Sequence, residues 1–169
     1  VLRPEGAWIA HVGDSRAYRI RDGRIEQLTF DHSYAWEMAR RLGVPPEDLS
    51  DVKKNVIIRS LGPDVLVQVD IEGPYPILPG DTFVLCSDGL SNQVNPEEIG
   101  TVVSALPATD ACKFLVELAN LRGGPDNITA VVVHYGGDAA STVASAMKKA
   151  PAFKAALLRA WHGWNRMVP

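Results

Sequence analysis

Residues 80–90 read Gly-Asp-Thr-Phe-Val-Leu-Cys-Ser-Asp-Gly-Leu, and this stretch gives the strongest structural signal in the chain. The run from Thr82 to Cys86 is apolar apart from the Thr82 hydroxyl, which is typical of a short buried strand. A Pro79-Gly80-Asp81 turn leads into it, and Ser87-Asp88-Gly89 follows it directly. Asp88 is therefore expected in a turn at the end of a buried strand.

Further strands and three helices are expected around this stretch. The strand patterns cover residues 7–12, 17–20, 24–28, 56–58, 65–71 and 128–134, and Asp22-Gly23 predicts a hairpin turn. The first helix should begin at a cap, Ser33 or Asp31, carry Trp36, Met38, Ala39 and Leu42, and end at Gly43 and Pro45-Pro46. The other two should start at Pro96, with Asn95 as cap, and run from about Thr109 to Leu121. The predicted fold class is α+β with layered antiparallel sheet.

Composition limits the class of protein without naming a function. The 169 residues are 46% hydrophobic, enough for the core of a single domain. A formal net charge of -3 argues against nucleic acid as the main partner. Cys86 and Cys112 have no Cys-x-x-Cys spacing and are expected to be free thiols of a cytoplasmic protein, and no apolar run is long enough to span a bilayer.

Gly136-Gly137 marks an expected boundary, with one domain over residues 1–137 and a tail over 138–169. From Ala139 onward the tail has no acidic residue, and its basic residues accompany an apolar stripe at helical spacing: Lys148, Lys149, Lys154, Arg159 and Arg166 with Phe153, Leu157, Trp161 and Trp164. Such an amphipathic helix packs on its own domain, or it contacts an anionic membrane surface or an acidic partner. Contact with the membrane surface would make the protein peripheral to the membrane.

Three aspartates share one setting, a turn attached to an apolar strand. They are Asp14, Asp88 and Asp126. Each alone is a common turn residue, but strand ends in a twisted sheet can converge on one site. Carboxylates held close together repel one another unless a cation neutralises them, and oxygen ligands without His or Cys favour Mg²⁺ or Mn²⁺.

The chemistry that such a site supports is phosphoester hydrolysis. Two metal ions roughly 3.5 to 4 Å apart activate a bridging water and polarise the phosphoryl oxygens, so that no Ser, Cys or His nucleophile is required. The sequence contains no nucleophile elbow, Cys-x5-Arg loop or P-loop lysine motif.

The order of four motifs resembles the bacterial PP2C (PPM) family of metal-dependent serine/threonine phosphatases. The motifs are Val-Gly-Asp-Ser-Arg at 12–16, Leu-Thr-Phe-Asp-His-Ser at 28–33, residues 80–90, and Gly-Gly-Pro-Asp-Asn-Ile-Thr at 123–129. The likeness runs from about Ala7 to Val133. It implies the C-terminal part of a PP2C-like layered β-sandwich flanked by helices, incomplete at the N-terminus.

The resemblance also implies roles for individual residues. Asp88 and Asp126 match family ligands of the binuclear metal centre, and Asp14 matches the residue that, with Asp88, holds a third and weaker metal. Gly89 is also expected to belong to the metal site. The complete domain would hold two or three Mn²⁺ or Mg²⁺ ions. Residues 31–60 match the flap beside the cleft, where the residues expected near substrate are His32, Ser33, Asn55 and Arg59.

Two departures from the family pattern affect these expectations. Many bacterial members have a His-Pro pair before the flap asparagine, where this chain has Asp51-Val52 before Lys53-Lys54-Asn55. The family's N-terminal phosphate-binding Arg, acidic pair and Asp-Gly-x-Gly-Gly loop have no match before Asp14. We therefore expect this chain alone to be weakly active or inactive, and to associate with its missing N-terminal half or with a second copy.

The sequence leaves three functions open. The first is hydrolysis of phosphoserine and phosphothreonine in proteins, as part of a larger phosphatase; the alternative is a non-catalytic or pseudo-phosphatase module that binds a phosphoprotein or a partner chain. A phosphoesterase for small molecules is the weakest of the three. Arg16 is expected to be a structural hydrogen-bond donor and His32 a loop residue that caps backbone groups, while His11 and His134 are expected to be scaffold.

Overall fold

The computed structural model describes residues 1–49, 52–53 and 56–136. The predicted tail over 138–169 and the flap residue Asn55 lie outside the described residues, so the expectations for them remain predictions. No helix in the described ranges has the length and apolar character needed to cross a membrane.

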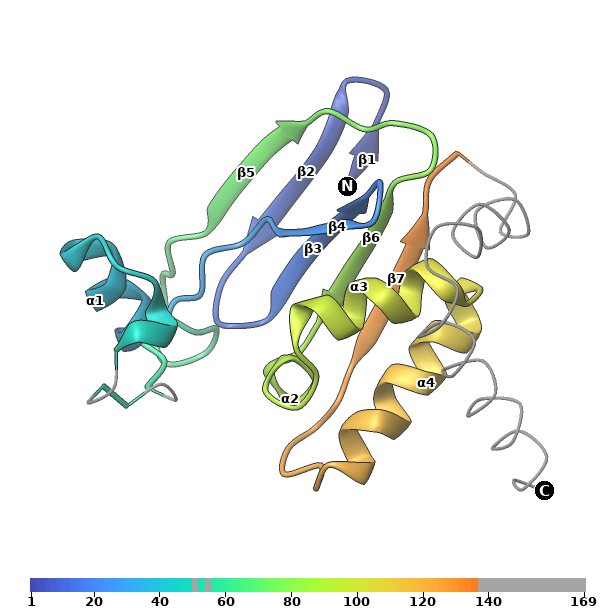
Figure 1. Cartoon of the computed structure of the whole chain (residues 1–169). Coiled ribbons are helices and arrows are strands. Elements are labelled where there is room, and N and C mark those ends of the chain that lie inside the picture. Colours follow the sequence, from blue (N-terminus) through green and yellow to red (C-terminus); the bar gives the residue numbers. More distant parts are fainter. Residues whose placement is uncertain (50–51, 54–55, 137–169) are drawn as a thin grey trace.

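Two antiparallel sheets form the centre of the described chain (Figure 1). The first has the order β1-β2-β5, with bounds Leu2–Arg3, Gly6–His11 and Asp70–Tyr75. The second has the order β4-β3-β6-β7, with bounds Arg24–Gln27, Arg16–Arg21, Thr82–Cys86 and Ala130–His134. Strand β6, which the sequence of residues 80–90 predicts, is thus an interior strand of its sheet, paired with β3 on one side and β7 on the other.

Helices cover one face of the second sheet and enclose the main core (Figure 1). They are α2 (Asp88–Ser91), α3 (Pro96–Ala105) and α4 (Ala108–Leu121). Alternate strand residues point into this layer, among them Tyr18 and Val84, which pack with Leu90, Ile99 and Leu115 from the helices.

On the other face of the same sheet, Ala7, Leu28 and Phe83 form a smaller cluster against the first sheet. The layers therefore run sheet, sheet, helices, and the predicted α+β class is confirmed.

The start of α3 follows from its local sequence. Asn95 accepts a hydrogen bond from the backbone N–H of Glu98, and the Glu98 side chain accepts one from the N–H of Asn95. This capping box, with Pro96 in the first turn, satisfies backbone donors that the helix itself leaves unpaired. The predicted start of this helix is confirmed.

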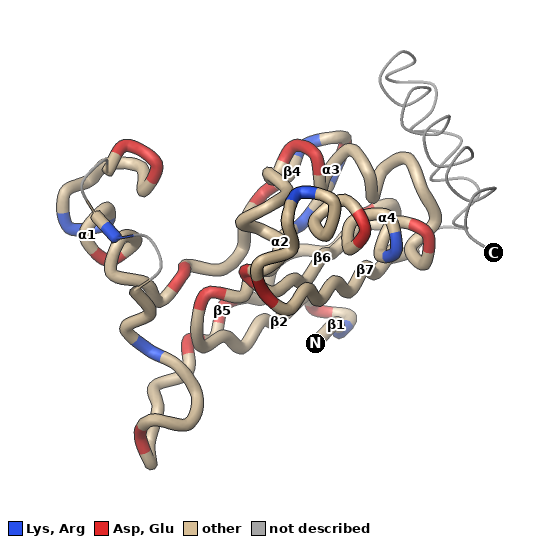
Figure 2. The backbone as a smooth tube through the Cα atoms, turned by 90° about the horizontal axis from the view of Figure 1, so that it is seen from below, with Lys and Arg blue, Asp and Glu red and all other residues tan. Residues whose placement is uncertain are grey.

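The helix α1 (Tyr34–Leu42) lies in a lobe to one side of the sheets (Figures 1 and 2). Of the two predicted caps, Ser33 is the one observed, because its hydroxyl accepts a hydrogen bond from the N–H of Trp36 at 3.3 Å. The helix ends at Gly43, whose φ of 67° is in the left-handed region that glycine tolerates best. A short 3₁₀ turn, η1 (Pro46–Asp48), follows.

Two strand predictions were wrong, and one short helix was missed. Residues 56–58 form only an isolated bridge, Ile57 to Ser33, and β5 begins at Asp70 and not at residue 65. Val65 and Leu66 are exposed, and pairing with β2 selects residues 70–75 instead. A β-branched run satisfies the strand pattern, but a strand also needs a partner with free hydrogen-bonding groups. The short helix α2 was not predicted, since four residues are too few for a helical period.

Candidate metal centre

Strand register brings the three turn aspartates to one end of the second sheet. Cys86 at the end of β6 pairs with Arg16 at the start of β3 and with Ala130 at the start of β7. Asp14 comes just before β3, Asp88 just after β6, and Asp126 a few residues before β7. Antiparallel pairing therefore places all three turns at the same end, and Figure 2, which looks toward that end, shows acidic positions around α2.

Asp88 lies within the electrostatic field of the other two carboxylates. The pKa of Asp88 is raised above its usual value, first by burial and then by the negative charges of Asp14 and Asp126. Asp88 and Asp14 are half-buried and Asp126 is exposed. A cation bound between them would offset the repulsion that raises this pKa.

Hydrogen bonds hold the Asp88 and Asp126 turns together. The Ser87 hydroxyl donates to the Asn127 carbonyl at 3.0 Å and accepts from the N–H of Thr129 at 3.0 Å. One oxygen of each carboxylate accepts from the next residue along the chain, Gly89 N–H to Asp88 Oδ1 at 2.8 Å and Asn127 N–H to Asp126 Oδ1 at 2.7 Å. Both carboxylates are thus oriented by their own turns.

Gly89 lies where only a glycine fits. An added Cβ would collide with the backbone carbonyl oxygen of Asn127. Gly89 is buried at the first turn of α2, so the close contact between the two turns depends on its missing side chain. We predicted Gly89 as part of the metal site, and its position gives it a backbone role beside Asp88.

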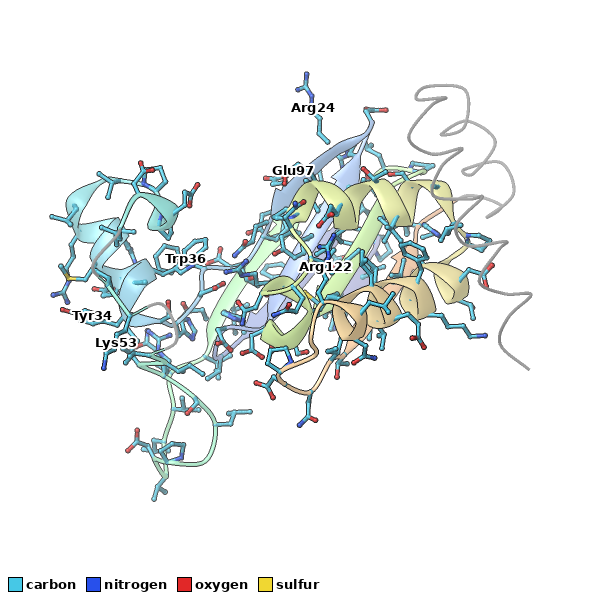
Figure 3. The ribbon with its side chains drawn as sticks, turned by 60° about the horizontal axis from the view of Figure 1, so that its bottom comes forward. Arg24, Tyr34, Trp36, Lys53, Glu97 and Arg122 are labelled. Carbon is cyan, nitrogen blue, oxygen red and sulfur yellow. The ribbon has the colours of Figure 1, made fainter. Side chains whose placement is uncertain are left out.

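Arg16 is held by structural contacts, as predicted. Its guanidinium donates to both carboxylate oxygens of Asp31, with Nη2 to Oδ2 at 2.7 Å, and Nη1 lies 3.4 Å from the Tyr18 hydroxyl. The group also lies 5.7 Å from the centre of the Trp36 ring. Figure 3 shows Trp36 between the α1 lobe and the sheets, so Arg16 and Trp36 join the two parts.

The flap residues expected near substrate that the structure describes are His32, Ser33 and Arg59, and all three are held by internal contacts. His32 is buried, and its Nδ1 accepts a hydrogen bond from the N–H of Gly13 at 3.0 Å, which confirms the predicted backbone cap. Ser33 caps α1. Arg59 Nη1 donates to Asp70 Oδ1 at 2.6 Å. Asp70 was missed, although a single acidic residue within the apolar run Val69-Asp70-Ile71 is a signal that could have found it.

The two remaining strand histidines have scaffold positions, as expected. His134 Nδ1 lies 2.8 Å from the Thr82 hydroxyl, across the pair of β6 and β7. His11 is buried at the end of β2, where its ring packs on that of His32 with centroids 4.6 Å apart.

The donor set fits part of the coordination shell of a hard cation. Within residues 1–49, 52–53 and 56–136, no group of three or more His, Cys, Asp or Glu side chains is placed to hold a metal ion by itself. The three aspartates nevertheless supply carboxylate oxygens to one region, and oxygen donors are what Mg²⁺ and Mn²⁺ prefer. Water or residues outside the described ranges would have to complete the shell.

The known proteins that are similar in sequence to this chain are serine/threonine phosphatases. No family model matches the chain. The serine/threonine phosphatase stp of Listeria welshimeri is 38% identical over 127 residues, which cover 74% of this chain and 50% of that protein. The chain spans about half the length of the curated relatives it matches.

Solved structures agree. The PPM Ser-Thr phosphatase MsPP from Mycobacterium smegmatis, in complex with cacodylate, matches with a TM-score of 0.69 and 35% identity over 76% of this chain and 56% of its own. The catalytic domain of the serine/threonine protein phosphatase PstP, in complex with two manganese ions, matches with a TM-score of 0.59 and 34% identity, over 74% of this chain and 51% of its own.

Proposed function

Because this chain belongs to the PP2C-type serine/threonine phosphatases, whose curated members it matches over about half of their length, we propose that it contributes metal-binding carboxylates to a protein phosphatase. The reaction would be hydrolysis of phosphoserine and phosphothreonine in proteins. The predicted PP2C-like architecture of stacked sheets with flanking helices is confirmed by the match to the solved phosphatases.

The convergence of Asp14, Asp88 and Asp126 is the observation that carries this proposal. Burial and the other two charges both raise the pKa of Asp88, so the metal-free site is electrostatically unfavourable. A protein gains stability at such a site when a divalent cation binds. The fixed turns, joined through Ser87 and Asn127, hold the ligands in place before the ion arrives.

Each aspartate has a proposed part. Asp88 and Asp126 would hold the ions of the binuclear centre, and Asp14 would share a further ion with Asp88. When bound, such ions supply Lewis acidity and activate water for attack on phosphorus. The Gly89 backbone keeps the turn that carries Asp88 against the turn that carries Asp126. The manganese ions in PstP support Mn²⁺ as the first ion to test.

Titration with Mn²⁺ tests the metal site directly. Calorimetry on the chain should detect binding, and Asp88→Asn should abolish it. Asp64→Asn, which removes one exposed carboxylate from the loop that follows Arg59, is the matched control and should bind as the original chain does. Equal Mn²⁺ affinity in the original chain and in Asp88→Asn would refute the proposed site.

Activity is tested in a protein that contains the whole domain. Such a protein should release phosphate from a phosphothreonine peptide with Mn²⁺ and stop when EDTA is added. Hydrolysis that survives exhaustive chelation would overturn the mechanism. Metal binding without hydrolysis would instead favour the non-catalytic module.

We further propose that this chain contacts the other half of the domain or a second copy of itself. Leu85 and Val131 are cross-strand neighbours, and both are about half exposed close to the aspartate turns. Apolar surface of this kind is stabilised by a covering chain. Light scattering at micromolar concentration should show an associated species, and a stable monomer would contradict this proposal.

A further inference from the structure

Three side chains from distant parts of the sequence meet behind the Gly13-Asp14 turn. They are His32 at the start of the flap, Arg59 near its end, and Asp70 at the start of β5. None of them belongs to the proposed ligand set. Together they connect the flap, the turn that carries Asp14 and the first sheet.

The hydrogen bonds of His32 determine its tautomer. Nδ1 accepts from the N–H of Gly13 at 3.0 Å, so we assign the ring proton to Nε2. Nε2 lies 2.9 Å from Oδ2 of Asp70 and donates to it. The ring therefore joins a backbone amide next to Asp14 to a carboxylate of the first sheet.

Arg59 completes the group through the same carboxylate. Its Nη1 donates to Asp70 Oδ1 at 2.6 Å and lies 3.1 Å from His32 Nε2. Since both nitrogens are donors, the carboxylate of Asp70 is what holds them together. Its pKa is lowered, first by the hydrogen bond from His32 and also by Arg59, as expected for a carboxylate stabilised in its charged form.

Backbone hydrogen bonds also join His32 to the Gly13 turn and to the flap end. Its N–H donates to the Gly13 carbonyl at 2.8 Å, and its carbonyl accepts from the N–H of Ile58 at 2.9 Å. His11 covers the other side of the ring, and His11 is itself the register partner of Asp70 in the pair of β2 and β5. A movement of the flap end at Ile58 and Arg59 must therefore reach Gly13 through His32.

We propose that His32, Asp70 and Arg59 are positioning residues that couple the placement of the flap to the placement of Asp14. Their effect on metal binding is exerted through the Gly13-Asp14 turn, because none of them is among the proposed ligands. This inference rests on the proposed metal site, because Asp14 has to be a ligand for the coupling to affect affinity. It gives buried His32 a role other than substrate contact.

The key variant is Arg59→Met, which keeps most of the side-chain volume and removes the donors to Asp70. Arg41→Met is the matched control. It also removes an ion pair within the flap, the one between Arg41 and Glu37, but this pair lies on the exposed side of α1. Arg59→Lys restores a positive donor and should recover most of the effect.

Two readouts separate coupling from its consequence. Amide hydrogen exchange, followed by NMR in the metal-free chain, should be about 10-fold faster at Gly13 in Arg59→Met. The dissociation constant for Mn²⁺, measured by water-proton relaxation, should rise about 10-fold, as for other residues that orient metal ligands. Arg41→Met should leave both readouts unchanged.

A double variant tests the route through Asp14. In an Asp14→Asn background, Arg59→Met should cause no further loss of Mn²⁺ affinity. An additive loss there, or unchanged Gly13 exchange in Arg59→Met, would overturn the coupling. If Arg59→Met fails to fold, the isosteric Asp70→Asn provides the same two readouts and is judged by the same outcomes.

The outcomes also distinguish the coupling from the metal site itself. Absent Mn²⁺ binding in the original chain refutes the metal site and the effect on affinity together. Normal binding that Asp88→Asn abolishes but Arg59→Met leaves intact refutes the coupling and leaves the metal site standing.

Discussion

The carbonyl oxygen of Asn127 lies so close to Gly89 that a methyl group on Gly89 would collide with it. This contact packs the turn of Asp88 against the turn of Asp126. Any residue larger than glycine must push the two turns apart, and with them two proposed ligands.

Gly89→Ala should therefore lower the free energy of unfolding by about 1–3 kcal/mol, the usual cost of overpacking, and should also weaken Mn²⁺ binding. Gly100→Ala is the control, because its Cβ would make only ordinary contacts with Ile25 at 3.4 Å and beyond. In a helix interior that change should stabilise by about 0.5–1 kcal/mol. Urea denaturation and calorimetry measure both quantities, and equal behaviour of the two variants would contradict the packing.

Asp88→Asn should have opposite effects with and without metal. The neutral amide removes a partly buried charge from the field of Asp14 and Asp126, so the metal-free melting temperature should rise. The increase in melting temperature that Mn²⁺ gives the original chain should be lost. Thermal unfolding with and without Mn²⁺ tests this, and a destabilised metal-free variant would count against carboxylate repulsion at this site.

The network around Asp70 predicts a pH dependence. Its pKa is lowered in the folded state, so it stabilises the fold above its unfolded value of about 3.9. That contribution is lost as the pH falls through the lower folded value. Asp70→Asn should make stability less dependent on pH between about pH 6 and about pH 3, as measured by urea denaturation. Asp64→Asn, the exposed control, should keep the original profile.

Arg122 links the end of α4 to α3 and supports the approach to Asp126. It donates to both carboxylate oxygens of Glu98 at 2.7 Å and to the Gln93 carbonyl at 2.6 Å, and Figure 3 shows it beside these helices. Arg122→Gln should cost at most about 1 kcal/mol of stability, because the pair is partly exposed. The Mn²⁺ affinity should fall as well, because the loop that carries Asp126 loses this anchor at the end of α4. Unchanged affinity would show that the loop before Asp126 is held by other contacts.

The two thiols should differ in reactivity. Burial raises the pKa of Cys86 to about 11, whereas Cys112 is half-buried on α4. Because the thiolate is the reactive form, iodoacetamide at about pH 8 should label Cys112 well before Cys86, as measured by mass spectrometry. Phosphatase activity of the whole domain should survive that labelling, and its loss would argue for a thiol in the chemistry.

The turns at Asp14 and Asp126 could be predicted because each depends on residues adjacent in sequence, whereas Asp88, expected in a turn, begins the unpredicted helix α2. Asp14, Asp88 and Asp126 each follow or precede an apolar strand, and antiparallel pairing brings such strand ends together. The capping box at Asn95 is likewise local.

Features that depend on distant partners were missed. The run from Val65 has strand-forming residues, yet pairing with β2 occurs only from Asp70 onward. Asp70 itself shows its importance only when Arg59 and His32 are placed around it. A sequence pattern indicates which residues can form a strand, but not which segment finds a partner.

The flap enters and leaves the sheets at one point. The N–H of Tyr34 donates to the Val56 carbonyl at 2.8 Å, and Ser33 is bridged to Ile57. Segments whose ends lie together are tolerant of insertion and replacement. We therefore expect that a flap of different length and surface could replace this lobe on the same two sheets, provided that His32 and Arg59 stay at its borders.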